Sequence, residues 1–214
     1  QEQVFFARDR LGVKPLFYSQ ADDVFVFGSE PKAILQHPKV QPVVGPEGLA
    51  EIFIIGPART PGHGVYKDMS ELRPGHAMIY SREGLRSYAY WKLESFAHTD
   101  SVDETAAKVR ELLQDTLERQ LVSDVPVCSL LSGGLDSSAL TALAVNYYNR
   151  TGQGRVSTFS VDYVNNDKHF KSHAFQPGAD GPWIKRMVEE LNTDHHYISF
   201  DTPELVEALD NALY

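Results

Sequence analysis

The sequence is poor in cysteine, which limits how the chain can be stabilised. Its 214 residues include one cysteine, Cys128, so no disulfide bond can form within the chain. A single thiol in a chain of this length favours a reducing compartment, and we predict a cytoplasmic location. Because Cys128 lies in an apolar stretch, we expect it to be a small buried core residue and not a reactive thiol.

Positive charge and long hydrophobic runs are also scarce. Lysine and arginine number 20 against 29 acidic residues, which gives a net charge of -9. This balance argues against broad binding to nucleic acids or to anionic membranes. The sequence contains no run of about 18 apolar residues, so we expect no transmembrane helix. The first residues also lack the basic and apolar regions of a signal peptide.

The two ends of the sequence are unusual for a natural protein. The chain opens on Gln1 and stops within a stretch that has helical spacing. Natural termini lie mostly in exposed polar segments. We therefore expect the chain to be a piece of a longer protein.

Residues 1–93 are rich in strand patterns. Strands are predicted at residues 4–7, 16–18, 24–27, 77–80 and 85–91, and short helices at 31–36 and 46–55. Residues 19–23 are polar and predict a hairpin loop. The aromatic residues on the first strands alternate, so we expect them to form core and not a base-stacking platform: Phe5, Phe6, Phe17, Phe25 and Phe27.

The polar stretch at residues 94–102 predicts a domain boundary, with one domain at 1–95 and a second at 96–214. A capping box, Ser101 to Glu104, predicts the start of a helix with one apolar face. Strands at 125–131, 156–163 and 196–200 then alternate with helices at 137–148, 183–191 and 203–214. This alternation predicts a doubly wound parallel sheet, with the first strand covered on both faces and ligands at the carboxyl ends of the strands.

One motif carries chemistry. Residues 132–138, Ser-Gly-Gly-Leu-Asp-Ser-Ser, join the first of these strands to a helix. The glycines let the backbone approach a ligand closely, and the amides at a helix start attract anions. The three serines add hydroxyl donors, so the segment suits a phosphate chain. Asp136 would repel a bare phosphate but suits a Mg²⁺ ion that bridges it to phosphate oxygens.

Several common motifs are absent from this segment. It lacks the lysine and spacing of a Walker A loop, the Gly-x-Gly-x-x-Gly dinucleotide fingerprint and the Gly-x-Ser-x-Gly nucleophile elbow. The plainer alternative is a serine-glycine turn that only caps a helix. Seven fitting positions in a strand-loop-helix context favour the phosphate-binding interpretation.

Residues 130–138 resemble the pyrophosphate loop of the N-type ATP pyrophosphatases, and most closely that of the glutamine-hydrolysing asparagine synthetases. Residues 7–18, 27–34 and 72–76 are similar to the late part of the glutaminase domain of that family. The resemblance covers nearly the whole chain. It implies an α/β protein: the β-rich C-terminal part of an Ntn-type glutaminase domain, followed by the N-terminal part of a doubly wound ATP pyrophosphatase domain.

The resemblance also implies a reaction and its site residues. Aspartate would attack the α-phosphate of ATP, and ammonia derived from glutamine would then displace AMP and give asparagine. Asp136 would bind Mg²⁺ and act catalytically, and Val161 would contact adenine. The remaining residues would bind the pyrophosphate or lie close to the nucleotide: Leu131, Ser132, Gly133, Gly134, Leu135, Ser137 and Ser138.

Some properties depart from the family pattern or stay open. The glutaminase of the family uses an amino-terminal cysteine as its nucleophile, and Gln1 is not that residue. We therefore expect little or no turnover from this chain alone. A homodimer is among the oligomeric states left open. Two alternative functions also remain: a related synthetase that activates another carboxylate, of the β-lactam or peptide-cyclising type, and a non-catalytic nucleotide-binding module.

Two further features of the sequence have less specific roles. His169, His173, His195 and His196 match no zinc-binding spacing, and we expect them to be solvated or hydrogen-bonded histidines. Residues 165–181 form a long loop after the second strand, for which a substrate lid and a surface insert are the two interpretations.

Overall fold

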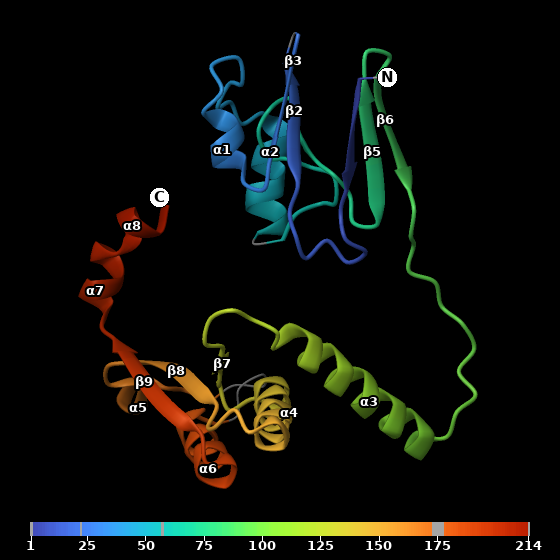
Figure 1. Cartoon of the computed structure of the whole chain (residues 1–214). Helices are drawn as coiled ribbons and strands as arrows, with labels where there is room; N and C mark the ends of the chain where they lie inside the picture. The colour runs from blue at the N-terminus through green and yellow to red at the C-terminus, as the bar shows by residue number, and fades with distance from the viewer. Residues whose placement is uncertain (1, 22, 57, 173–177, 214) are drawn as a thin grey trace. The chain divides into compact units, whose positions relative to one another are not determined.

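The computed structural model describes residues 2–21, 23–56, 58–172 and 178–213 (Figure 1). The chain divides into two compact units, Gln1–Ala97 and His98–Tyr214. None of the helices in the described ranges combines the length and the apolar character needed to cross a membrane.

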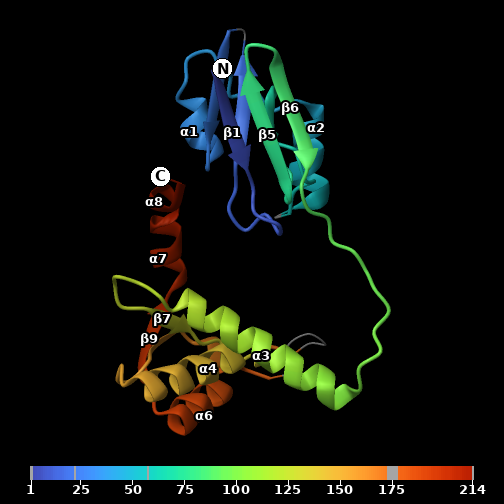
Figure 2. The ribbon, with the colours of Figure 1, turned by 45° about the vertical axis from the view of Figure 1, so that its right-hand side comes forward.

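The first unit contains two antiparallel sheets. One has the order β1-β5-β6, formed by Gln3–Ala7, His76–Ser81 and Gly84–Ala89 (Figure 2). The other has the order β3-β2-β4, formed by Val24–Gly28, Phe17–Ala21 and Met69–Glu71. The hairpin predicted around Gly84 is confirmed by the pairing of Ser81 with Gly84. The predicted loop at 19–23 is too long, because β2 continues to Ala21 and the Ser19 hydroxyl donates to the Asp68 carbonyl (2.9 Å).

Three helical segments accompany these sheets. They are α1 (Pro31–Leu35), α2 (Pro46–Ala50) and the π-helix η1 (Glu51–Ile55). The single helix expected at 46–55 is thus an α-helix that widens into a π-helical turn. Phe53 and Ile54 of η1 are exposed, so this helix buries little of its apolar surface within the unit.

The core of the first unit lies on both faces of the second sheet. One cluster joins the two sheets through Phe6 of β1 and Met78 of β5, with Phe25 stacked on Tyr80 at 4.3 Å between ring centroids. The other cluster packs Phe17 against Ile34 of α1. The sheet β3-β2-β4 therefore lies between the other sheet and α1, which buries apolar side chains in two layers.

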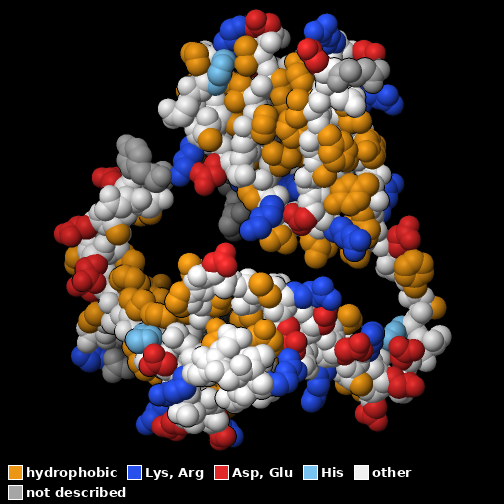
Figure 3. All heavy atoms as spheres, in the orientation of Figure 1, with side chains coloured by type: hydrophobic (Ala, Val, Ile, Leu, Met, Phe, Trp, Pro, Cys, Tyr) orange, Lys and Arg blue, Asp and Glu red, His pale blue; other side chains and the backbone are white. Residues whose placement is uncertain are grey.

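The aromatic residues only partly follow the prediction. Phe6 and Phe17 are buried and Phe25 is partly buried, as expected. Phe5 and Phe27 are 61% and 54% exposed, so their assignment to the core was wrong. Phe5 lies on the opposite face of β1 from Phe6, and that face is not covered. Hydrophobic side chains consequently reach the surface of the molecule (Figure 3).

A buried ion pair connects separate segments of the first unit. Arg8 follows β1, and its guanidinium lies 3.0 Å from the Glu71 carboxylate, with both side chains 6% exposed. The guanidinium also donates to the carbonyls of Leu72 (2.6 Å), Gly12 (3.0 Å) and Lys14 (3.1 Å). These bonds compensate for the removal of two charges from water, so Arg8 links β1, β4 and the following loop.

The second unit begins with α3 (Val102–Gln120) and continues as a parallel sheet. Its strands are β7 (Cys128–Leu130), β8 (Ser157–Tyr163) and β9 (Asp194–Phe200), in the order β7-β8-β9. The helices α4 (Leu135–Thr151), α5 (Asn166–His169) and α6 (Gly181–Leu191) connect the strands, and α7 (Thr202–Glu207) and α8 (Leu209–Leu213) follow. The capping box of Ser101 and Glu104 is confirmed.

Two local predictions in this unit were incomplete. The helix expected at 203–214 is divided into α7 and α8, and α7 begins with a second capping box, Asp201 to Glu204. The region 165–181 contains the helix α5, whereas residues 173–177 lie outside the described residues. The substrate lid therefore stays a prediction.

The sheet of the second unit is covered on one face. Ser129 of β7 bonds to Thr141 of α4 through their hydroxyls (2.8 Å), so α4 packs on the Ser129 face. Side chains alternate along a strand, which places Cys128 and Leu130 on the other face, where both are exposed. Cys128 is therefore not buried, and the first strand is not covered on both faces, so both predictions were wrong for the described structure. The described structure as a whole is that of a mixed α/β protein.

Candidate functional site

The serine-glycine segment lies where the parallel sheet meets α4. The backbone N–H of Leu131 donates to the Phe159 carbonyl (2.8 Å), which extends the β7–β8 ladder by one residue. The Ser160 hydroxyl donates to the Leu131 carbonyl, and the Leu131 side chain is buried. Residues 132–134 then cross to the first turn of α4. The loop therefore lies at the carboxyl end of the sheet, as predicted.

The two glycines have different structural requirements. Gly133 has a φ of +77°, and a Cβ atom there would lie 3.0 Å from the Asp180 carbonyl oxygen and 3.0 Å from Trp183 Cβ. Gly134 is extended, with φ -72° and ψ 166°, and a Cβ there would lie no closer than 3.5 Å to its nearest neighbour. Gly133 is thus required by the fold, whereas Gly134 leaves the loop surface open to a ligand.

The start of α4 offers unpaired amide donors. Gly134 is the N-cap and contributes no side-chain cap, and the first helical hydrogen bond is donated by Ser138 to the Gly134 carbonyl (3.1 Å). No hydrogen bond among the described residues engages the backbone N–H groups of Gly134, Leu135 and Asp136. Together with the helix dipole, these amides form a region that attracts an anion.

The serine hydroxyls of the loop are connected to one another. The Ser137 hydroxyl donates to the Gly134 carbonyl (3.2 Å) and accepts from the Ser132 backbone N–H (3.3 Å). Because the only proton of the Ser137 hydroxyl goes to Gly134, the Ser132 hydroxyl is the donor in its 3.0 Å contact with Ser137. Ser138 is half-buried one residue further along α4. The structure thus brings the Ser132 and Ser137 hydroxyls together, whereas Ser138 lines a hollow beside Gly133 and Trp183 of α6.

The remaining predicted residues lie around this loop. Asp136 is the second residue of α4 and is exposed, and Leu135 before it is 85% exposed. Val161 lies on β8, two residues beyond Phe159, which pairs with Leu130 of β7. Val161 is half-exposed and on the same face as Phe159. It therefore lies toward the carboxyl end of the neighbouring strand.

A lone carboxylate at this position suits a nucleotide-bound magnesium ion. Within the described part of the chain, no group of three or more His, Cys, Asp or Glu side chains is arranged to hold a metal ion. Mg²⁺ usually binds one or two carboxylates, with phosphate oxygens and water as the other ligands. Asp136 beside the free amides fits that donor set, in which most ligands arrive with the phosphates.

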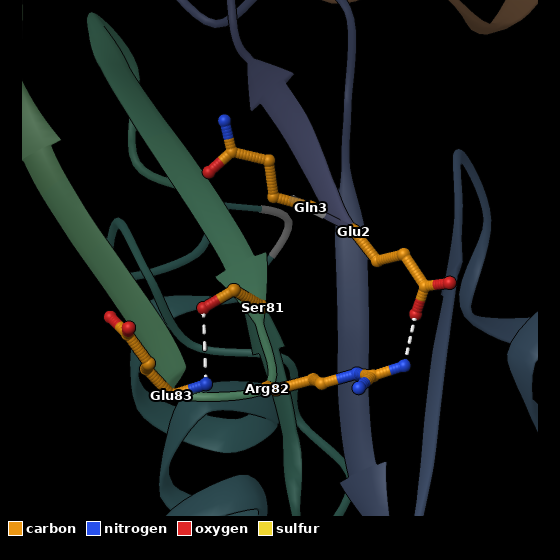
Figure 4. A pocket seen from close by; sticks show the side chains of 5 residues that line it. All are labelled: Glu2, Gln3, Ser81, Arg82 and Glu83. Atoms are coloured by element: carbon orange, nitrogen blue, oxygen red, sulfur yellow. Dashed lines mark hydrogen bonds and ion pairs between the residues drawn. The ribbon is translucent and has the colours of Figure 1, made fainter.

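Other hollows in the structure have a different character. The hollow shown in Figure 4 lies at the start of β1 and the β5–β6 turn. Its Arg82 and Glu2 are exposed and paired with each other at 2.6 Å, so their charges are already compensated. A second, apolar hollow of about 400 Å³ lies between α3, β7 and α4, with Leu117, Cys128 and Leu140 among its walls. Neither hollow combines free donors with a catalytic group.

The histidines behave largely as expected where they are described. His173 and the side chain of His169 lie outside the described residues. The Thr158 hydroxyl donates to Thr193 (3.0 Å), so the contact of 2.8 Å between Thr158 and His195 Nδ1 requires a proton on that nitrogen. In the neutral ring His195 Nε2 then carries no proton, and it is buried without a hydrogen-bond partner in the described structure.

This arrangement predicts a pH dependence of stability. Burial, and secondly the neighbouring His196, lower the pKa of His195 below its ordinary value of 6.5. The unfolded chain therefore binds more protons than the folded chain just below pH 6.5, and stability falls as the pH drops through this region. We expect the unfolding midpoint of His195→Asn to depend less on pH between 7.5 and 5.5. An NMR titration that gives the His195 ring a pKa of 6.5 or above would contradict this explanation.

Gly133 provides a test of how the loop is held. We expect Gly133→Ala to cost about 1–3 kcal/mol more than Gly152→Ala, because both residues have left-handed φ but only Gly133 lacks room for a Cβ. Calorimetric unfolding midpoints of the two variants measure this difference. Equal losses would show that the close approach of Asp180 and Trp183 to Gly133 does not constrain the loop.

Comparison with known proteins finds a family profile that matches most of each unit. The family profile described as asparagine synthase matches residues 108–214, which is half of the chain. The profile of a glutamine amidotransferase domain matches residues 1–91. The two matches do not overlap.

Individual relatives resemble nearly the whole chain. "Asparagine synthetase [glutamine-hydrolyzing] 3" of Bacillus subtilis is 52% identical over 98% of this chain and 34% of its own length. "Putative asparagine synthetase [glutamine-hydrolyzing] 2" of Methanocaldococcus jannaschii is 28% identical over 97% of this chain and 38% of its own length. "Amidase chry2" of Gibberella zeae is 29% identical over 100% of this chain and 32% of its own length.

The chain thus spans about a third of the length of these relatives. The profile match covers the strand, the serine-glycine loop and the helix that together form the candidate site. On this evidence the chain belongs to the asparagine synthase family.

Proposed function

We propose that this chain is part of an enzyme that makes asparagine from aspartate and ATP, with glutamine or ammonia as the nitrogen donor. In this reaction the aspartate side-chain carboxylate attacks the α-phosphate of ATP and pyrophosphate leaves. Ammonia then attacks β-aspartyl-AMP and releases AMP. The observation that carries the proposal is the loop 132–138, whose free amides and hydroxyls surround the start of α4.

Each loop residue has a proposed role. The amides of Gly134, Leu135 and Asp136 would bind the phosphate oxygens that become pyrophosphate, together with the hydroxyls of the loop. This part of the site comprises Ser132, Gly133, Gly134, Leu135, Ser137 and Ser138. Such fixed donors stabilise the charge that develops on the leaving group.

Three further residues complete the proposed site. Asp136 would bind Mg²⁺, and this ion would neutralise phosphate charge when it is present. Val161 would contact adenine from β8. The Leu131 side chain is buried and both of its backbone polar groups are used. We propose that Leu131 fixes the loop beside the nucleotide.

The domain assignment forms part of the proposal. Residues 1–95 would be the C-terminal part of an Ntn-type glutamine amidotransferase domain. Residues 96–214 would be the N-terminal part of a doubly wound ATP pyrophosphatase domain. Because the loop supplies only phosphate and magnesium contacts, turnover is expected from the complete protein and little from this chain alone. A cytoplasmic location and a homodimer fit this enzyme class and remain proposals.

A related synthetase that activates another carboxylate is the second candidate. The loop supports it equally well, since contacts to phosphate and magnesium can serve either substrate and do not select the carboxylate. The two candidates differ in which carboxylate triggers cleavage of ATP.

Pyrophosphate release separates these candidates. The complete protein would be given Mg-ATP and ammonium, with and without aspartate. We expect release that depends on aspartate, together with formation of asparagine. Release that requires a carboxylate other than aspartate would support the second candidate, and ATP binding without release whichever carboxylate is supplied would support a non-catalytic nucleotide-binding module.

A further inference from the structure

Two buried hydroxyl groups donate hydrogen bonds to the backbone at the two ends of the phosphate loop. Ser160 of β8 is 4% exposed, and its hydroxyl donates to the carbonyl of Leu131, the residue just before the loop. Thr141 of α4 is fully buried, and its hydroxyl donates to the carbonyl of Ser137 (2.7 Å). Neither side chain belongs to the motif at 132–138.

The contact made by Thr141 is more than local helix bonding. A threonine in a helix often donates to the carbonyl four residues earlier, and this bond alone would have little significance. Here the Thr141 oxygen also contacts the Ser129 hydroxyl of β7 (2.8 Å). Because the Thr141 proton goes to Ser137, Ser129 is the donor in this contact. The first turn of α4 is thereby connected to the strand before the loop.

The Ser160 contact has a comparable role on the other side. The Leu131 N–H continues the strand ladder to Phe159, and its carbonyl accepts from the Ser160 side chain. Leu131 is almost inaccessible to solvent, so no bulk water can replace the hydroxyl. A buried carbonyl that loses its donor is costly, and the backbone would have to move to recover one.

We propose that Ser160 and Thr141 are positioning residues that set the separation between the two ends of the phosphate loop. They act through the Leu131 and Ser137 carbonyls and do not touch the phosphates themselves. The amides of Gly134, Leu135 and Asp136 lie between these two fixed points. Small displacements of fixed donors weaken their contacts with a ligand strongly. This inference rests on the proposed phosphate-binding function of the loop.

The structure offers a matched control, Thr158. This residue is also fully buried on the same sheet, but its hydroxyl bonds to Thr193 and contacts His195, with no bond to the loop. Thr158→Val removes an equally buried hydroxyl without releasing either end of the loop. Thr141→Ser keeps the hydroxyl and removes only a methyl group.

The test measures the Kd of Mg-ATP by titration calorimetry on the complete protein, with unfolding midpoints and pyrophosphate release recorded in parallel. We expect Ser160→Ala and Thr141→Val to raise the Kd about fivefold to tenfold. Thr158→Val and Thr141→Ser are expected to stay within about twofold of the wild type, although Thr158→Val lowers the unfolding midpoint.

The outcomes are distinguishable. If Ser160→Ala and Thr141→Val change the Kd no more than Thr158→Val does, the positioning role is refuted and the hydroxyls contribute only to stability. If Thr141→Ser binds as weakly as Thr141→Val, the hydroxyl is not the cause. A wild-type protein that binds Mg-ATP but releases no pyrophosphate would refute the proposed reaction, while the comparison of Kd values would still decide this inference. Absence of Mg-ATP binding would refute both.

Discussion

Replacing Asp136 with asparagine is expected to lower aspartate-dependent pyrophosphate release by about a thousandfold. The carboxylate lies at the second position of α4, beside amides that have no partner among the described residues. Asparagine keeps the shape and one acceptor but removes the negative charge that Mg²⁺ requires. The rate would be measured in the complete protein over a range of magnesium concentrations, since excess metal restores part of the activity if binding of the ion is what was lost.

Asp103 is a close control for this substitution. It is the second residue of α3, as Asp136 is of α4, and both interact with the positive end of a helix. Asp103→Asn is therefore expected to have a similar small effect on helix stability and to leave pyrophosphate release unchanged. Comparable activity losses in the two variants, or an active Asp136→Asn enzyme, would remove Asp136 from the catalytic site.

The second large effect concerns the buried ion pair of the first unit. We expect Arg8→Met to lower the free energy of unfolding by about 3–5 kcal/mol. The substitution leaves the buried Glu71 carboxylate without its close partner, because Arg59, the other cation near it, is 3.8 Å away and much more exposed. It also removes the donor to three backbone carbonyls. Methionine retains an unbranched apolar stem of similar reach.

The exposed pair of Arg82 and Glu2 is the control for this prediction (Figure 4). Arg82→Met breaks a shorter contact between the same chemical groups, but solvent screens it, so we expect no measurable change in stability. The first unit contains Trp91 and the second contains Trp183, the two tryptophans of the chain. Urea unfolding followed by fluorescence in a Trp183→Phe background therefore reports the first unit. Similar losses from both arginine substitutions would show that burial does not determine the strength of the pair.

Much of the local structure could be predicted from short-range patterns. The capping box at Ser101, the turn before Gly84 and the strand-loop-helix order around 132–138 all appear in the structure. Each depends on residues within a few positions of one another, so the sequence contains all the required information. The capping box at Asp201 was available in the same way, and it could have located the start of α7.

Burial was predicted less well. Phe5 lies on an uncovered face of β1 and Cys128 on the uncovered face of β7, whereas Phe27 is exposed although its ring lies 4.8 Å from that of the buried Phe6. The pattern of a strand indicates which residues share a face. It does not indicate whether another layer covers that face, because the covering element comes from elsewhere in the chain.

The sequence by itself determined the Ser-Gly-Gly-Leu-Asp-Ser-Ser loop between a strand and a helix, with Asp136 at the start of that helix, and the family to which the chain belongs. Only the tertiary structure decided how that loop is held. Gly133 has no room for a side chain because α6 packs against it, and the buried hydroxyl of Ser160 holds Leu131 from the next strand. These contacts join residues 29 or more positions apart. Folding brings them together through packing across the sheet, for which the local spacing of residues gives no signal.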